Sequence, residues 1–329
     1  MTGAAPVVLD AMGGDHGPAE VVAGAVLACR EHGVPVVLVG PAPRLAEELR
    51  RHGAADEVAV AHAEDAVPMT ERGAGATALA ASSLAIGCDL VGRGEGGALV
   101  SAGSTGAVVA CAVRGIGRAT GVLRPALAVA LPSLPGGASV LVDAGAITDP
   151  RPAMLAQFAL LGVGYARAVL GVADPVVGLL SIAAEPGKGN RLARQAEELL
   201  SELPVRFHGP VEGHDVLAGT VDVIVTDGFT GNVVLKNVEG CVRTALTMVA
   251  DAGIAPPDRL AEVARRYDPQ THGGAVLLGL RGTVVVAHGS SRAATIARAC
   301  VVAHTLAGRD PAAGIAASTV TASAVTAAG

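Results

Sequence analysis

The sequence predicts an α/β protein in which helices cover both faces of a mostly parallel sheet. Short apolar runs rich in β-branched residues alternate along the chain with longer segments of helical spacing. Most of these runs are continuously apolar, as in strands that are buried on both faces. Strands that alternate with helices are typical of parallel sheets, in which each crossover is a helix.

The strands and helices are expected at regular places along the chain. In the first helix Pro18 suits the opening turn, and apolar residues recur behind it at three- and four-residue intervals. We predict strands at residues 6–9, 34–39, 58–61, 98–100, 126–131, 139–142, 176–182, 221–226 and 283–287. We predict helices at residues 18–32, 43–52, 77–91, 152–170, 191–203, 232–251 and 290–306.

The organisation along the chain indicates one α/β domain over residues 1–311. Residues 253–274 differ from the rest, because Pro256 and Pro257 interrupt the pattern before a short polar helix at 258–266. We expect this segment to form a helical excursion on the surface. The Ala/Thr/Ser-rich residues 312–329 are expected to be a C-terminal tail.

Composition excludes several classes of protein. The chain has 329 residues, 51% of them hydrophobic, which excludes a disordered chain. A net charge of −6 and an aromatic content of 2% disfavour nucleic-acid binding, so we expect no nucleic-acid partner. The five cysteines are scattered without a CxxC pair, which indicates reduced thiols in a cytoplasmic protein and no metal site. The sequence contains no window of about 18 uninterrupted apolar residues, so we predict no membrane-spanning helix.

Three glycine-rich loops follow predicted strands and lead into predicted helices. They lie at residues 103–106, 227–232 and 288–291. Glycine lets backbone N–H groups turn inward, and the helix N-terminus adds partial positive charge, which is how proteins bind phosphate or an oxyanion. Ordinary helix capping by Ser, Thr and Asn is the alternative for each loop. Three such loops at the carboxyl ends of strands favour a shared anion site.

A further loop, Asp10-Ala-Met-Gly-Gly-Asp-His16, follows the first predicted strand. Its two carboxylates and its imidazole suit ligand orientation, metal binding or proton transfer. The alternative is that Asp10 and Asp15 accept hydrogen bonds from amides of the turn.

Lys188 is the most informative single residue. Of the 24 lysines and arginines, only Lys188 and Lys236 are lysines. Because the chain otherwise uses arginine, a lysine indicates a position that needs a compact ammonium group. Lys188 lies in a loop between a predicted strand and a predicted helix, where a cation stabilises phosphate and a developing oxyanion. A solvent-exposed loop lysine is the alternative. A P-loop is excluded, because Gly189 follows Lys188 where that motif has Ser or Thr.

Taken in order, six motifs resemble those of the bacterial phosphate acyltransferase (PlsX) family. They are Asp10–His16, Ser101-Ala-Gly-Ser-Thr-Gly-Ala107, Arg124-Pro-Ala126, Glu185-Pro-Gly-Lys-Gly-Asn190, Asp227-Gly-Phe-Thr-Gly-Asn232 and His288-Gly-Ser-Ser291. The resemblance implies a three-layer αβα sandwich related to isocitrate/isopropylmalate dehydrogenases. It also implies a homodimer that transfers a fatty acyl group from acyl carrier protein to inorganic phosphate, and whose acyl phosphate product serves phospholipid synthesis.

The resemblance also implies which residues form the site. It assigns the activity to Lys188 and Asn232. Phosphate is already a nucleophile and a thioester is already activated, so no covalent protein nucleophile is required. No metal or cofactor is expected. The expected substrate- and phosphate-binding residues are Asp10, Gly13, Gly14, Asp15, His16, Gly103, Ser104, Thr105, Gly106, Asp227, Gly228, Thr230, Gly231, His288 and Ser290.

The chain departs from the family pattern at several positions. Ser104 and Ile147 stand where the family usually has asparagine. Peripheral membrane docking is not expected, because the stretch 252–257 breaks the apolar helix face that docking needs.

These departures leave alternatives open. One is an acyltransferase that uses acyl-coenzyme A or a specialised carrier protein, and the other is a catalytically impaired regulatory paralogue. A dehydrogenase is disfavoured, because no nicotinamide-binding fingerprint occurs.

Carrier proteins are acidic, so a basic docking patch is expected. The candidates are Arg243, Arg259, Arg265 and Arg266, for which a solvated helix face is the alternative.

Overall fold

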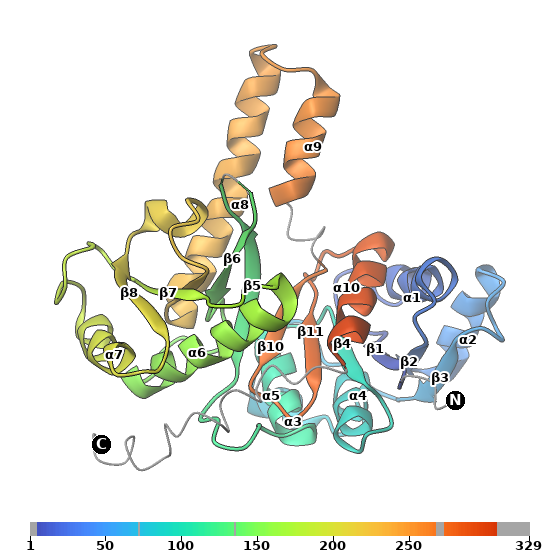
Figure 1. Ribbon diagram of the computed structural model, residues 1–329. Helices are drawn as coiled ribbons and strands as arrows, with labels where there is room; N and C mark the ends of the chain where they lie inside the picture. The colour runs from blue at the N-terminus through green and yellow to red at the C-terminus, as the bar shows by residue number, and fades with distance from the viewer. Residues whose placement is uncertain (1–4, 72, 135, 268–272, 308–329) are drawn as a thin grey trace. The chain divides into compact units, whose positions relative to one another are not determined.

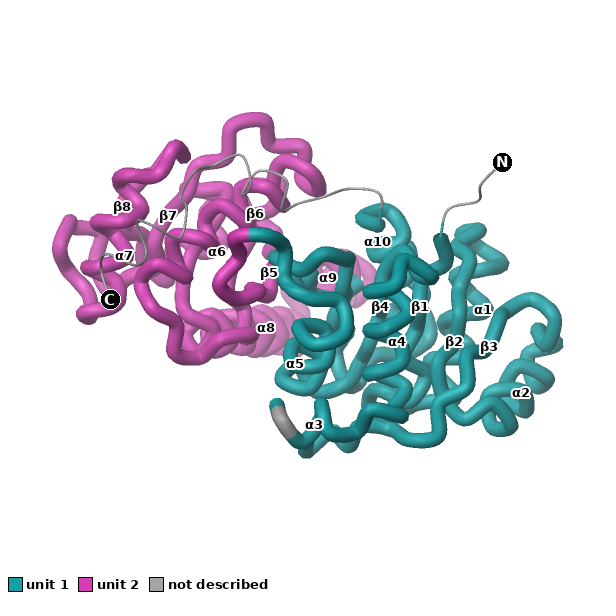
Figure 2. The backbone as a smooth tube through the Cα atoms, turned by 90° about the horizontal axis from the view of Figure 1, so that it is seen from below, with its two compact units in different colours: residues 1–120, 272–310 teal, residues 121–271, 311–329 magenta. Residues whose placement is uncertain are grey.

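The computed structural model describes residues 5–71, 73–134, 136–267 and 273–307. The chain forms two compact units, one of residues 1–120 and 272–310 and the other of residues 121–271 and 311–329 (Figures 1 and 2). Each unit is a sheet with helices packed on it, which confirms the predicted α/β class. The prediction of one domain over residues 1–311 stays a prediction, and the predicted tail at 312–329 lies outside the described residues.

The first unit has the strand order β3-β2-β1-β4-β11-β10. All neighbours are parallel except β10 and β11, which form an antiparallel pair. Figure 1 shows α1 and α10 on one side of these strands and α3, α4 and α5 on the other. The strands are β1 (Val7–Asp10), β2 (Val36–Gly40), β3 (Ala59–His62), β4 (Ala98–Ser101), β10 (Ala275–Leu278) and β11 (Thr283–Val286). The helices are α1 (Ala19–His32), α2 (Ala42–Arg51), α3 (Ala74–Ala78), α4 (Ser83–Gly92), α5 (Thr105–Gly115) and α10 (Ala293–Leu306).

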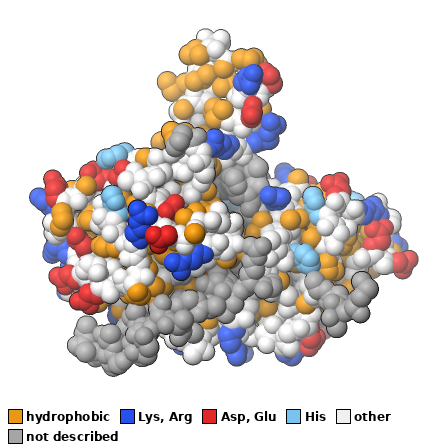
Figure 3. Space-filling model, in the orientation of Figure 1, with side chains coloured by type: hydrophobic (Ala, Val, Ile, Leu, Met, Phe, Trp, Pro, Cys, Tyr) orange, Lys and Arg blue, Asp and Glu red, His pale blue; other side chains and the backbone are white. Residues whose placement is uncertain are grey.

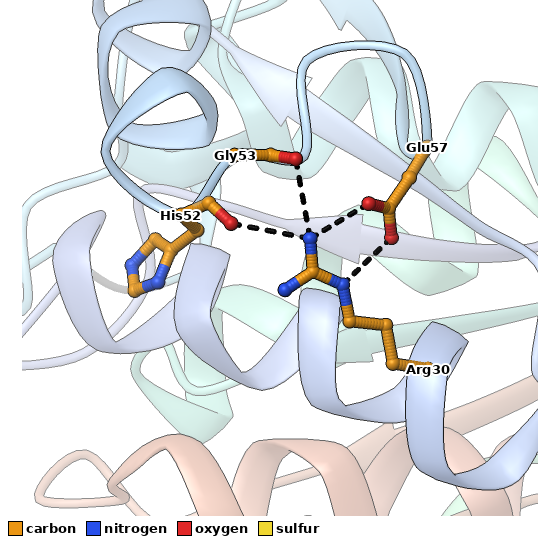
Figure 4. A network of polar contacts seen from close by, with 4 residues as sticks. All are labelled: Arg30, His52, Gly53 and Glu57. Atoms are coloured by element: carbon orange, nitrogen blue, oxygen red, sulfur yellow. Dashed lines mark hydrogen bonds and ion pairs between the residues drawn. The ribbon is translucent and has the colours of Figure 1, made fainter.

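A polar network links α1 to the end of α2 (Figure 4). The Arg30 guanidinium donates to the Glu57 carboxylate at 2.8 and 2.6 Å, and to the carbonyls of His52 and Gly53 at 3.1 and 3.2 Å. The ion pair lowers the pKa of Glu57 and raises that of Arg30. Both side chains are exposed, so the network fixes the geometry of this corner more than it stabilises the fold.

The second unit has the strand order β5-β6-β9-β7-β8. The pair β5 and β6 is antiparallel, and the remaining neighbours are parallel. Its strands are β5 (Ala126–Pro132), β6 (Ala138–Val142), β7 (Val176–Leu180), β8 (Arg206–Val211) and β9 (Val223–Val225). Its helices are α6 (Pro152–Tyr165) with a π-helical turn (Ala166–Leu170), α7 (Arg191–Ser201), a 3₁₀ turn (Gly213–Leu217), α8 (Gly228–Asp251) and α9 (Pro257–Tyr267).

Helix α6 forms the core of the second unit. Phe158 and Leu161 are fully buried, and Leu155 is 2% exposed. Together with its π-helical turn, α6 is long and apolar enough to cross a membrane by length and composition, and 61% of that apolar window is buried within the protein. Among the described residues it is the one helix that passes this test.

Helices α8 and α9 form a hairpin that projects from the second unit (Figure 1). The predicted excursion at 253–274 is therefore a turn and a second helix, of which the described part ends at Tyr267. Hydrophobic side chains gather over the projecting part (Figure 3), where Met248 is 66%, Ile254 74% and Val263 44% exposed.

Some predicted elements need correction. The helix expected at 77–91 is two helices, because the Ser82 hydroxyl accepts the Ala85 N–H and starts α4 afresh. Strand β8 was not predicted, because it contains Gly209 and Pro210 and is half exposed at the sheet edge. Strand β10 was not predicted either, since a four-residue apolar run does not distinguish strand from helix.

Candidate active site

Three loops of the first unit meet at one edge of its sheet. They follow β1, β4 and β11, which are adjacent and parallel. The N–H of Asp15 donates to the carbonyl of Gly289 at 2.8 Å. A Cβ on Gly13 would lie 2.8 Å from the nitrogen of Gly103, so only glycine allows this approach. The predicted site residues that these loops carry are Gly13, Gly14, Asp15, His16, Gly103, Ser104, Thr105, Gly106, His288 and Ser290.

Asp10 holds these loops from beneath. Its side chain is 3% exposed and accepts from the hydroxyls of Ser83 at 2.6 Å and Ser101 at 2.7 Å, and from the N–H of Met12 at 3.2 Å. Burial raises the pKa of Asp10, and these hydrogen bonds oppose the rise. Asp10 therefore positions the loops. Its bond from the Met12 N–H is the kind that the alternative of turn amides predicts, but the two shorter bonds come from serine hydroxyls. Direct contact of Asp10 with phosphate stays a prediction.

The start of α5 is available to an anion. Ser104 is the N-cap residue but makes no side-chain capping hydrogen bond, so the capping alternative does not describe this loop. The first N–H groups of a helix have no partner within it and carry partial positive charge. At the start of α10, by contrast, the Glu20 carboxylate already accepts the Ala293 N–H at 2.8 Å.

His288 is fixed by its own loop. Its Nδ1 accepts the N–H of Ser290 at 3.2 Å and lies 2.8 Å from the Ser290 hydroxyl. His288 is therefore held in place by contacts with Ser290 of the same loop.

In the second unit, three further loops lie at one sheet edge, after β6, β9 and β7. These strands are adjacent and parallel. The loop after β6 is held by Asp143, which is fully buried and accepts four backbone N–H groups, from Leu127, Gly145, Ala146 and Ile147, at 2.7 to 3.0 Å. Burial raises the pKa of Asp143, and the N–H groups oppose the rise. Sequence reasoning did not select Asp143 as a site residue, because its partners are backbone groups that leave no sequence pattern.

Helix α8 begins against this loop. Asp227 caps the helix, accepting the Thr230 N–H at 2.8 Å and the Thr230 hydroxyl at 2.7 Å, so the capping alternative describes this loop. A Cβ on Gly231 would overlap the carbonyl oxygen of Asp143, and one on Gly228 would lie 2.7 Å from the Asp143 carboxylate. These two glycines let the first turn of α8 lie directly on the loop after β6.

Asn232 lies beside the loop after β6. The Cβ position of Gly145 is 3.6 Å from the Asn232 Cβ and 3.7 Å from its Oδ1. Asn232 is exposed, and it belongs to the first turns of α8. Its amide is thus placed at the carboxyl edge of the sheet, as the motif predicted.

Lys188 lies on the exposed loop between β7 and α7. The flanking Gly187 and Gly189 have φ of 77° and 99°, which glycine adopts without strain. Helix α7 holds the loop through Glu197, which accepts the Gly187 N–H at 3.1 Å, and Arg194, which donates to the Gly189 carbonyl at 2.6 Å.

The two lysines differ in their surroundings. Lys188 forms no ion pair within the described part of the chain, whereas the ammonium of Lys236 lies 2.9 Å from the Glu239 carboxylate. Lys236 is therefore a surface residue of α8, while Lys188 presents an uncompensated cation at the sheet edge.

One pocket joins the Lys188 loop to the start of α8. Its wall includes Gly189 and Asn190 from the loop, and Thr226, Asp227 and Thr230 from the strand end and first turn of α8. Asn190, Thr226 and the neighbouring Ser181 were not predicted as site residues. Ser181 and Thr226 are polar residues at the ends of predicted strands, and Asn190 directly precedes a predicted helix, and these positions are the signal that identifies them. Among the described residues no cluster of His, Cys, Asp or Glu suits a metal ion.

The fold defines the class of the protein. A phosphotransacetylase structure from Streptococcus pyogenes matches with a TM-score of 0.66 at 17% identity, over 92% of this chain and 94% of that one. A 4-hydroxythreonine-4-phosphate dehydrogenase structure from Klebsiella pneumoniae matches with a TM-score of 0.56 at 13% identity, over 93% and 100%. The chain thus has the α/β fold that these acyltransferase and dehydrogenase structures share, as predicted.

Sequence comparison identifies the family within this class. The family model described as "Fatty acid synthesis protein" matches residues 5–313. Proteins named phosphate acyltransferase are 53% identical in Thermobifida fusca, over 91% of this chain and 87% of the relative, and 46% identical in Gloeobacter violaceus, over 87% and 88%. One from Thermus thermophilus is 45% identical over 89% and 92%. The chain belongs to this phosphate acyltransferase family of fatty acid synthesis proteins.

Proposed function

We infer that this chain transfers a fatty acyl group from a thioester to inorganic phosphate, producing an acyl phosphate for phospholipid synthesis. One observation carries the proposal: an unpaired Lys188 on the loop after β7 and the amide of Asn232 in the first turns of α8, which follows β9, lie at the same edge of these two adjacent parallel strands. The names of relatives up to 53% identical support it.

The reaction needs positioning and charge stabilisation. An oxygen of HPO₄²⁻ attacks the thioester carbonyl carbon, and a C–O bond forms while the carbonyl electron pair moves to oxygen. When the electron pair on oxygen re-forms the carbonyl double bond, the C–S bond breaks and sulfur leaves with the bonding electrons. The proton that the phosphate carried then converts the thiolate to a thiol. Lys188 neutralises charge on phosphate or the oxyanion, and Asn232 donates a hydrogen bond to it. The reaction uses no metal and no cofactor.

Acyl carrier protein is the proposed donor. The resemblance of the six motifs supports it, and exposed Arg259 and Arg265 on α9 suit an acidic carrier. A panel of acyl-carrier-protein and acyl-coenzyme A thioesters with equal chains tests this choice. We expect a higher kcat/KM for the acyl-carrier-protein thioester than for the acyl-coenzyme A thioester. A higher kcat/KM for the coenzyme A thioester would change the proposed donor and leave the proposed acyl transfer to phosphate in place.

Replacing Lys188 tests the reaction itself. We expect Lys188→Ala to lower phosphate-dependent acyl phosphate formation, trapped as hydroxamate, by about 10²–10³-fold. Lys236→Ala is the matched control and is expected to retain full activity, because Lys236 pairs with Glu239 on the surface. Near-normal turnover by Lys188→Ala would remove Lys188 from the mechanism.

A catalytically impaired paralogue gains no support from the two departures. Ile147 contributes its backbone N–H to Asp143 and its carbonyl to Gly228, which any side chain allows. Ser104 leaves the start of α5 uncapped. The backbone bonds of Ile147 therefore do not depend on its side chain, and Ser104 leaves the first N–H groups of α5 open to a ligand.

A homodimer in the cytoplasm completes the proposal. The exposed Met248, Ile254 and Val263 of the α8–α9 hairpin support an apolar contact with a second copy. All five cysteines are free, which suits a reducing compartment. Light scattering is expected to give twice the chain mass of 32.3 kDa, and the single mass would contradict the dimer.

A further inference from the structure

The pocket between α7 and α8 is mainly apolar on its inner wall. It lies within the second unit, at the carboxyl ends of β7 and β9. The apolar side chains come from the end of β7, from α6 and from the first turn of α7, and they include Leu155, Leu179, Leu180, Ile182 and Leu192. Leu155 and Leu179 are 2% and 1% exposed and form its floor, whereas Ile182 is 79% exposed at the surface.

The charged group in this wall argues against an anionic occupant. Asp227 is the one charged residue among those lining the pocket. Both its oxygens accept hydrogen bonds from Thr230, so it is satisfied by its own helix. A phosphate in the pocket would meet this carboxylate at close range and be repelled. The pocket therefore suits a neutral, apolar group.

The size of the pocket limits the length of that group. Its volume is about 170 Å³. An apolar cavity of ~150 Å³ holds one benzene molecule, so this pocket accommodates about six carbon atoms.

One polar atom in the wall lacks a partner. The hydroxyl oxygen of Ser181 is buried and has no hydrogen-bond partner among the described residues. A Cβ on Gly189 would lie 2.8 Å from that oxygen, so the hydroxyl faces the Lys188 loop. A buried hydroxyl without a partner is costly unless a ligand satisfies it, and a carbonyl oxygen does so.

We propose that this pocket holds the first carbons of the acyl chain, with the acyl carbonyl at Ser181 and the Lys188 loop, and that Leu192 helps to set which chains fit. This inference rests on the proposed acyl transfer and names the part of the substrate that the pocket binds. The phosphate then lies outside the pocket, on the side of Lys188, and the remainder of a long chain leaves over Ile182.

Binding of alkylphosphonates tests the pocket without turnover. These probes carry a stable anionic end and a chain of chosen length, from ethyl to decyl, and calorimetry measures their Kd. Burying each CH₂ contributes ~0.8 kcal/mol, so affinity is expected to rise about fourfold per carbon up to about six carbons and then level off. Affinity that does not depend on chain length would overturn the proposal.

Two substitutions of Leu192 shift the limit in opposite directions. Leu192→Phe fills the pocket, and affinity is expected to level off at a shorter chain, with at least tenfold loss for hexylphosphonate and little change for ethylphosphonate. Leu192→Ala is expected to move the limit to a longer chain. Leu199→Phe, on the same helix but outside the pocket wall, is the matched control. An unchanged limit in both Leu192 variants would contradict the assignment.

Turnover distinguishes this inference from the function on which it rests. Thioesters from butanoyl to hexadecanoyl are compared as substrates. If the wild type is active and Leu192→Phe shifts the preferred chain length, the result supports both the acyl pocket and the proposed acyl transfer. If the protein is active but neither Leu192 variant changes the preferred chain length, the assignment of the pocket is overturned and the proposed acyl transfer is kept. Chain-dependent phosphonate binding without acyl phosphate formation from any thioester overturns the function and keeps an apolar pocket.

Discussion

Asp10 and Asp143 do the same physical work in the two units. Each lies at the carboxyl end of a buried strand and is at most 3% exposed. Asp10 accepts mainly from serine hydroxyls, and Asp143 accepts from four backbone N–H groups. A short carboxylate at a strand end thus fixes the loop that follows it. Asp10 was predicted as a site residue because the polar residues Asp15 and His16 follow it in the same loop. The loop after Asp143, Ala144-Gly-Ala-Ile147, contains no polar side chain, so Asp143 was not predicted.

Replacing Asp10 by the uncharged Asn is expected to alter how stability depends on pH. Burial raises the pKa of Asp10 above its unfolded value of 3.8, so the folded state binds the proton more tightly. That contribution to stability is present at low pH and is lost as pH rises through the folded pKa. The free energy of unfolding of the wild type, relative to Asp10→Asn, should therefore fall as pH increases from about 4.

Urea unfolding at several pH values between 4 and 7 measures this difference. Asp251→Asn, at the exposed end of α8, is the control and should show no comparable trend. A wild-type advantage that grows with pH would contradict the assigned direction.

At the scale of elements, buried strands and long helices were predictable, and their ends were not. Helix α8 was expected from residue 232 but begins at Gly228, because Asp227 caps it. Helix α10 was expected from residue 290 but begins at Ala293, because His288 holds Ser290 in the preceding loop. In both cases a local side-chain hydrogen bond decides the boundary, and apolar periodicity does not report it.

Two glycines of α8 are expected to respond oppositely to the same substitution. Gly231→Ala places a Cβ onto the Asp143 carbonyl oxygen, so it should destabilise the protein by about 1–3 kcal/mol and displace Asn232. Gly240→Ala meets nothing within 4 Å, and alanine's helix propensity should stabilise the protein by about 0.5–1 kcal/mol. Denaturant unfolding and turnover of both variants measure this. Equal effects at the two positions would show that the first turn of α8 does not depend on close approach to the loop.

At the scale of the whole molecule, the order of the motifs predicted the family correctly, and the family and the α/β class are confirmed. The site residues stay predictions, with their loops placed within two units. Residues 10–16, 101–107 and 288–291 belong to the first unit, and residues 185–190 and 227–232 belong to the second. The sequence does not reveal this division, because β10, β11 and α10 return to the first unit after the whole described part of the second.

This chain order predicts that the second unit acquires its structure first during refolding. Its described residues, 121–134 and 136–267, have no segment of the first unit between them, whereas the first unit needs β10, β11 and α10, which follow the described part of the second unit in the chain. Closing such a long loop costs entropy. The chain carries a separate probe for each unit. Both tyrosines, Tyr165 and Tyr267, lie in the second unit, and Cys88, Cys111 and Cys300 are buried or nearly buried in the first.

Burial also makes the three thiols unreactive once the first unit has formed. It raises the pKa of Cys111 to about 11 and that of Cys300 to about 12, so at pH 8 about one Cys111 in a thousand is a thiolate. After dilution from urea, tyrosine fluorescence should therefore recover before pulsed iodoacetamide stops labelling these cysteines, while exposed Cys241 stays reactive throughout. Protection of the three thiols before the tyrosine signal recovers would mean that β10, β11 and α10 reach the first unit without waiting for the second, and that chain order does not govern assembly.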